Sequence, residues 1–237
     1  NIGSKFQLKE ETRPTDTYTA DQETASGYGM LDMPLSARAR LIAGARVEMF
    51  QQTVDTFDPF VRQIGDNPTI LRAQLDETNL FPAANFVYSL APNQNLRFGV
   101  SQTVNRPEFR ELAPFEFTDV VGGRAVVGNL NLKQSLIQNV DFRWEFFPGA
   151  EEVISAGFFY KNFNNPIERI VEPTAQLRTS FTNADSANNA GFELEARKLF
   201  SEFVLIGANY TYVDSEVTLD AAARQVQTSL VRSLAGT

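Results

Sequence analysis

The stretch "NVDFRWEFFPG", Asn139 to Gly149, decides the fold class. Successive side chains of an extended strand point to opposite faces, so this stretch has one apolar face and one charged face. The apolar face carries Val140, Phe142, Trp144 and Phe146, and the other carries Asp141, Arg143 and Glu145. Such alternation predicts a half-buried β-strand whose apolar face contacts either a protein core or lipid.

The same period of two recurs in "RLIAGARVE", "NLRFGVS", "ISAGFFYK", "GFELEARK" and "VLIGANYTY". Short turns are predicted at residues 32–35, 91–94, 147–151 and 199–202, and long connections at 57–76, 105–134 and 165–187. Tight and long connections therefore alternate, which is typical of an up-and-down antiparallel barrel. We expect about nine or ten strands, beginning with "IGSKFQLKEE" and "ASGYGML".

Composition excludes several classes of protein. The 237 residues are 43% apolar with a net charge of -8, which argues against a disordered chain and against a nucleic-acid binder. Cysteine and histidine are both absent, which removes thiol nucleophiles, Ser-His-Asp triads, the usual zinc sites and disulfides. Asp185, Asp214 and the neighbouring asparagines lack the spacing of a calcium loop. We therefore expect no enzyme, no cofactor and no metal site.

Alternation alone also fits a soluble β-sandwich, so other features must decide between a core and lipid. The longest uncharged stretch, Thr78 to Leu96, contains Pro82 and Pro92 and is no transmembrane helix. A mixed polar face, the asymmetry of turns and loops, and aromatic residues such as Phe147 and Phe200 beside the turns favour a transmembrane barrel. The fold class predicted is thus an all-β, antiparallel, up-and-down transmembrane β-barrel, present in part.

Several longer motifs then carry a resemblance: "VNRPEFRELAPFEF" (104–117), "GNLNL" (128–132), "SAGFFYKNFNNPIE" (155–168), "NADSANNAGFELEARK" (183–198) and "ANYTYVDSEV" (208–217). In this order and spacing they resemble the barrel domain of TonB-dependent outer-membrane receptors over nearly the whole chain. Leu130 departs from the family, which usually has Pro after Gly-Asn. The resemblance implies a barrel of about 22 strands around a globular plug. Residues 1–237 would be a segment of that barrel, with the plug domain and the C-terminal strands absent.

The resemblance also implies a function and its partners. It implies import of a scarce nutrient across the bacterial outer membrane, a siderophore, cobalamin or glycan, powered by the TonB complex through an absent N-terminal part. The expected partners are outer-membrane lipid, the plug domain and a small-molecule or oligosaccharide ligand, without nucleic acid. A passive porin-like channel and a secreted β-sandwich binding module remain alternatives.

Two sets of residues are candidate sites. Loop residues proposed to contact ligand are Phe60, Arg62, Gln63, Asp66, Arg106, Arg110 and Glu111. Residues expected to face the lumen and the plug are Arg97, Arg143, Glu145, Glu193 and Arg197. Each set has a purely structural alternative. "NRPEFRE" would also serve as a hydrogen-bonded turn that shapes the barrel rim, and charges in a wet lumen are often simply solvated.

Overall fold

The computed structural model describes residues 17–57, 70–117, 125–172, 177–201 and 203–219. The first expected strand, "IGSKFQLKEE", lies outside these residues, and the second forms part of the first strand that is described. No helix within the described ranges is long and apolar enough to cross a membrane.

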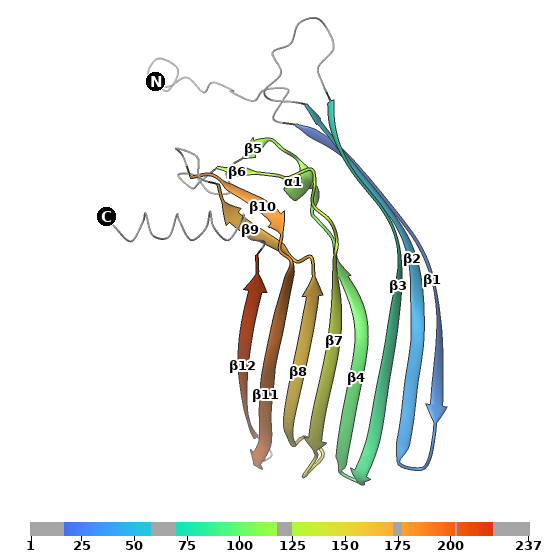
Figure 1. The fold of residues 1–237 in the computed structure, drawn as a ribbon. Coiled ribbons are helices and arrows are strands. Elements are labelled where there is room, and N and C mark those ends of the chain that lie inside the picture. The colour runs from blue at the N-terminus through green and yellow to red at the C-terminus, as the bar shows by residue number, and fades with distance from the viewer. Residues whose placement is uncertain (1–16, 58–69, 118–124, 173–176, 202, 220–237) are drawn as a thin grey trace, which may run out of the picture.

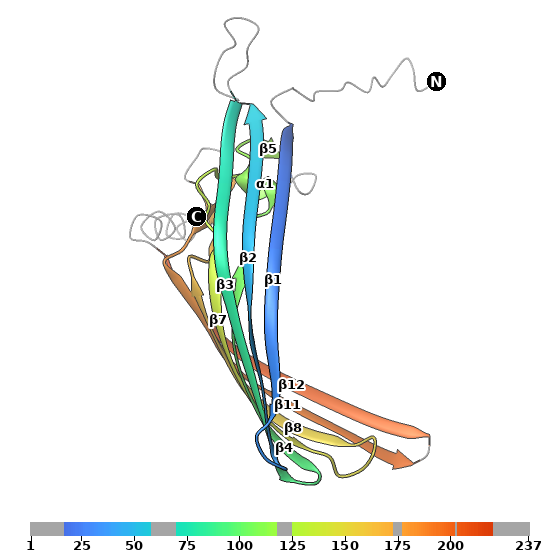
Figure 2. The same cartoon turned by 90° about the vertical axis from the view of Figure 1, so that its right-hand side faces the viewer.

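Eight long strands form one antiparallel sheet (Figure 1). They are β1 (Tyr18–Pro34), β2 (Ala39–Phe57), β3 (Ile70–Ala91), β4 (Gln94–Asn105), β7 (Ser135–Phe146), β8 (Val153–Asn164), β11 (Ser186–Ser201) and β12 (Val204–Thr218). Each long strand pairs with the next one along the chain, which confirms the predicted up-and-down order. The sheet is strongly curved, and among the described strands it does not close, since β1 and β12 each have one neighbour (Figure 2).

Tight and long connections alternate along this sheet as the sequence predicts, although some boundaries differ. The first turn occupies residues 35–38 rather than 32–35. β1 continues through Pro34 because proline is tolerated at the end of a strand with one paired edge. The turn is then formed at Ser36, whose hydroxyl accepts hydrogen bonds from the backbone N–H groups of Arg38 and Ala39.

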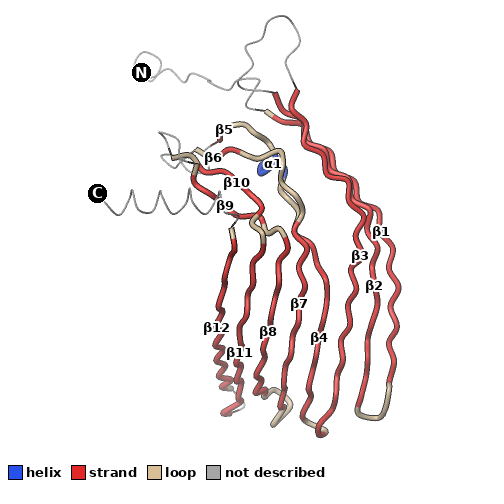
Figure 3. The backbone as a smooth tube through the Cα atoms, in the orientation of Figure 1, coloured by secondary structure: helices blue, strands red, loops and turns tan. Residues whose placement is uncertain are grey.

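The predicted long connections are shorter than expected because parts of them fold. β3 begins at Ile70 and pairs with β2 as far as Phe57, so the segment from Ile70 to Asp76 is strand rather than loop. The other two connections contain the helix α1 (Phe109–Leu112) and the short strands β5 (Glu116–Phe117), β6 (Val126–Val127), β9 (Ile167–Val171) and β10 (Thr179–Asn183). These four strands form a second sheet at one end of the first (Figure 3).

The two faces of the large sheet differ in the way that the alternation predicts. We call the face that carries Phe98 and Phe142 the outer face, and the face that carries Arg97 and Phe50 the inner face. Aligned pairs across six neighbouring strands form an aromatic row on the outer face: Phe86, Phe98, Phe142, Phe158, Phe192 and Tyr212. Phe158, in the middle of this row, is 50% exposed. Exposed aromatic side chains across so many strands indicate a surface that contacts lipid.

Candidate functional site

The end of the sheet with the long connections is built up into a rim. α1 begins at Glu108 with a capping box, in which the Glu108 backbone N–H donates to the Glu111 carboxylate at 2.9 Å. The amide of Gly128 donates to the carbonyl oxygen of Ala113 at 3.1 Å, which holds the returning chain against the helix. A Cβ at Gly128 would lie 2.3 Å from that oxygen, so only glycine fits this close approach.

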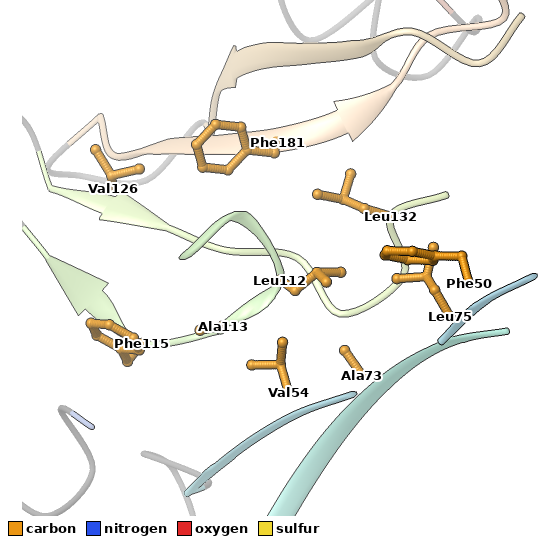
Figure 4. Packing of buried hydrophobic residues seen from close by; sticks show 10 residues of the cluster. All are labelled: Phe50, Val54, Ala73, Leu75, Leu112, Ala113, Phe115, Val126, Leu132 and Phe181. Atoms are coloured by element: carbon orange, nitrogen blue, oxygen red, sulfur yellow. The ribbon is translucent and has the colours of Figure 1, made fainter. Parts of the chain in front are cut away.

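An apolar cluster fastens the rim to the sheet (Figure 4). Its members from β2 and β3 lie beyond the level at which β4 ends: Phe50, Val54, Ala73 and Leu75. Its members from the rim are Leu112, Ala113, Phe115, Val126, Leu132 and Phe181. Both Leu112 and Val54 are fully buried, so the outward extension of β2 and β3 is the wall against which the rim packs.

Arg106 lies between this cluster and the inner face of β2. Its Nη1 is 2.6 Å from Glu48 Oε1, and its guanidinium lies 3.9 Å from the centre of the Phe50 ring. Arg46 Nη2 contacts the same carboxylate at 2.8 Å. The Glu48 side chain is only 9% exposed, and two cations balance its buried charge. Arg106 is therefore held firmly, in an ion pair and a cation–π contact.

A hollow of about 520 Å³ opens beside Arg106, and its lining is partly apolar and partly polar. Gln52, which is 2% exposed, lines it and donates from Nε2 to the carbonyl oxygen of Pro107 at 3.2 Å. The Gln52 Oε1 atom and the Nε and Nη2 atoms of Arg106 have no hydrogen-bond partner among the described residues. Buried polar groups are normally paired, so these three atoms are suited to bind a further polar group in the hollow.

The other predicted rim residues lie in local contacts. The Arg110 guanidinium is 4.7 Å from the centre of the Phe117 ring, and Glu111 completes the capping box of α1. Arg110 and Arg106 both line the hollow, whereas Glu111 does not. The candidates Phe60, Arg62, Gln63 and Asp66 lie outside the described residues. Gln52 was missed from the sequence, although its place on the inner face of β2 follows from the alternation in that strand.

The predicted luminal charges all lie on the inner face, and three of them are joined. Arg97 Nε contacts Glu145 Oε2 at 2.7 Å, and Arg143 Nε contacts Glu145 Oε1 at 3.3 Å. Arg143 Nη2 also contacts Glu195 Oε2 at 2.8 Å, so the ion pairs run across β4, β7 and β11. Glu195 was not among the predicted residues, although "GFELEARK" places it on the charged side.

Glu193 and Arg197 line a second hollow, of about 430 Å³, on the inner face of β8, β11 and β12. Arg143, Ser155 and Asn209 line it as well. Two arginines and two glutamates at one place make a surface that suits a polar partner of mixed charge, rather than a strongly acidic or strongly basic one. Within the described ranges no three acidic side chains are close enough together to hold a metal ion.

Comparison with known proteins identifies this architecture. The family model described as "TonB dependent receptor-like, beta-barrel" matches residues 3–232. The chain belongs to the TonB-dependent receptor family. It therefore contributes strands to a barrel in the bacterial outer membrane. A search of curated proteins found no match to this sequence.

Solved structures of TonB-dependent receptors share the fold. The copper transporter OprC superposes with a TM-score of 0.64 at 19% identity, over 85% of this chain and 30% of that one. The ferric yersiniabactin uptake receptor FyuA from Yersinia pestis gives 0.60 at 18% identity, over 86% of this chain and 28% of that one. The siderophore receptor PirA from Pseudomonas aeruginosa gives 0.54 at 18% identity, over 84% and 44%. The chain thus spans less than half the length of each of these receptors.

Proposed function

We propose that this chain is the ligand-gathering part of an outer-membrane receptor that imports a scarce nutrient with energy from the TonB complex. The observation that carries the proposal is the mixed hollow at the rim, where Gln52 and Arg106 present unpaired polar atoms beside aromatic rings. A site of this kind suits a ligand with both polar and aromatic or apolar groups. The similar structures are those of a copper transporter and of siderophore receptors, so a chelated metal is the class to test first.

The luminal ion pairs support the other half of this proposal. Fixed charges on the inner face, such as Arg143 and Glu145, offer complementary contacts to a globular domain seated in the lumen. In the proposed mechanism such a plug closes the barrel until TonB shifts it toward an open state. Binding free energy alone does not move a ligand uphill, so the plug transition requires an external source of energy.

Uptake by cells tests this proposal directly. Cells that carry the full-length receptor are supplied with copper(II), a ferric catecholate or ferric yersiniabactin, with the TonB complex intact or deleted. We expect at least one of these probes to accumulate only when the receptor and the TonB complex are both present. Accumulation of all three at equal rates without the TonB complex would support the passive-channel alternative instead.

The rim hollow itself is tested by substitution in the full-length receptor. Gln52→Leu keeps the approximate size of the side chain and removes both of its polar atoms, so we expect weaker binding of the imported probe with a folded barrel. Gln51→Leu is the matched control because Gln51 lies next to it and faces outward. Equal affinities of the two variants would place ligand recognition elsewhere, for example in the predicted loop that carries the candidates Phe60 and Asp66.

A further inference from the structure

On β4, β7, β8, β11 and β12 the outer face of the large sheet carries a polar row near the point where its apolar rows end. Aligned pairs across five neighbouring strands form it, and we call it the amide row: Gln102, Gln138, Asn162, Asn188 and Glu216. Its middle members lie two residues from Val140, Tyr160 and Ala190, which belong to the preceding row of the same face. Side chains two apart on a strand share a face, so the amide row points outward and not into the lumen.

The amide row lies at the extracellular end of the strands. Gln138 is three residues from the start of β7, where the long connection enters, and nine residues before Phe147 in the tight turn. At about 3.3 Å per residue and a tilt of about 40°, these nine residues span about 23 Å along the membrane normal. The apolar band of an outer-membrane barrel is about 25 Å tall, so Gln138 lies at its outer boundary.

The boundary runs obliquely over the strands, as expected of a tilted barrel. On β1, β2 and β3 the outer face turns polar only at the aligned residues Glu23, Gln51 and Asp76, far along their extensions. On β12, Asp214 already lies one row before Glu216. Toward β12 the amide row therefore rises out of the apolar band and into the headgroup region.

Hydrogen bonds order the middle of the row. Asn188 Oδ1 accepts from the Tyr160 hydroxyl at 2.7 Å and from Asn162 Nδ2 at 2.7 Å. Among the described residues no partner engages Asn188 Nδ2, Asn162 Oδ1 or the Gln138 amide, so these groups remain to donate and accept outward. The side chains from Gln138 to Asn188 are uncharged, and neutral amides beside a tyrosine ring suit the hydroxyl groups and rings of sugars better than phosphate.

We propose that Gln138, Asn162 and Asn188, together with Tyr160, bind the core sugars of the glycolipid that forms the outer leaflet of the outer membrane. The row lies on the lipid-facing side, at the height of the headgroups, and it offers fixed donors and acceptors to hydroxyl groups. This contact would anchor the barrel at a defined depth. It is independent of the nutrient site, which lies on the inner face.

The test compares two double variants of the full-length receptor in vesicles of phosphatidylethanolamine and phosphatidylglycerol, with or without lipopolysaccharide that has an intact core. The row variant is Gln138→Leu with Asn188→Leu. The control is Asn139→Leu with Asn189→Leu, which also replaces two side-chain amides by leucine, at the adjacent inward-facing positions. We expect lipopolysaccharide to raise the melting temperature of the wild type and of the control equally, and to raise that of the row variant by less than half as much.

Three results would overturn the proposal. The first is a wild-type melting temperature that lipopolysaccharide leaves unchanged. The second is an equal rise in the melting temperatures of the row variant and the control, which would show that these side chains do not bind the glycolipid. The third is full stabilisation by lipopolysaccharide without core sugars, which would assign the contact to its phosphates or acyl chains. Nutrient binding is measured on the same samples. It should be equal in the wild type and the row variant, because the amide row and the nutrient site lie on opposite faces of the sheet.

Discussion

At the scale of single residues, the face on which a side chain lies matters more than its chemical type. Phe142 and Asp141 are neighbours in β7, yet one contributes to the aromatic row on the outer face and the other lies on the inner face beside Gly99. Substitution by arginine should therefore be harmful at Phe142 and tolerated at Asp141. This contrast gives the sharpest test of the membrane assignment.

We predict that Phe142→Arg impairs assembly of the full-length receptor and that Asp141→Arg is tolerated. Arginine on the lipid face near the midplane costs about 2–4 kcal/mol, whereas an arginine in the lumen stays hydrated. The measurement is the yield of heat-modifiable barrel in outer membranes. Equal yields of the two variants would mean that the assigned faces are wrong.

Gly128 carries a second prediction at this scale. Gly128→Ala places a Cβ against the backbone oxygens of Ala113 and Arg110, neither of which can turn aside as a flexible side chain would. Such overpacking costs about 1–3 kcal/mol, so rim amides should exchange with solvent about tenfold faster or more. Gly27→Ala is the control because nothing lies within 4 Å of its Cβ position. Unchanged exchange in the rim would show that the loop relaxes at no cost.

At the scale of elements, β2 and β3 each pass through two environments, the lipid-facing part of the sheet and the rim. The first half of β2 and the second half of β3 contribute lipid-facing residues. The second half of β2 and the first half of β3 extend past the end of β4 and form one wall of the rim. The inner face of the extension is buried because α1 and the small sheet pack on it. The outer face of the extension is polar. There the Arg72 guanidinium donates two hydrogen bonds of 2.7 Å to the Asp55 carboxylate.

Removal of the apolar anchor of α1 should loosen the rim without unfolding the barrel. Leu112 is fully buried, and Leu→Ala changes at such sites cost about 2–5 kcal/mol. We expect Leu112→Ala to expose the rim to limited proteolysis while heat-modifiable barrel is retained. Leu90→Ala, at an exposed position on β3, should do neither. Loss of the barrel in Leu112→Ala would mean that the rim and the barrel fold as one unit.

The ion pair of Asp55 predicts a small dependence of stability on pH. The hydrogen bond from Arg72 lowers the pKa of the Asp55 carboxyl below its usual value near 3.8. The pair therefore contributes its full stabilisation above that usual value, and the contribution is lost as the pH falls through the lowered pKa. The melting temperatures of wild type and Asp55→Asn should differ at neutral pH, and the difference should shrink as the pH falls below about 3.8. A difference that does not shrink on acidification would contradict this account.

At the scale of the whole molecule, the described sheet leaves two edges open. β1 and β12 each pair on one side only, and unpaired edges recruit other strands. We predict that residues 1–237 expressed alone aggregate in plain buffer, because the apolar outer face and the two edges are both exposed. A monodisperse monomer that unfolds cooperatively without detergent would contradict this prediction and support a soluble sandwich.

The sequence by itself determined the fold class, the order of the strands and the face of each residue. These features depend on the period of two and on turn residues, which are local properties of the chain. The positions of Arg97, Arg143 and Glu193 on the inner face of the sheet were predicted for the same reason. Boundaries were predicted less well where a contact with a distant segment decided them, as at Ile70, which becomes strand because it pairs with Phe57.

Only the tertiary structure decided how the rim is built and which residues meet there. Gln52, Arg106 and Pro107 are joined across more than fifty residues, and the alternation in β2 says only that Gln52 faces inward. The amide row is likewise invisible in any one strand, because each strand contributes a single polar residue. Its alignment follows from the register of five strands, which the pairing of the whole sheet fixes.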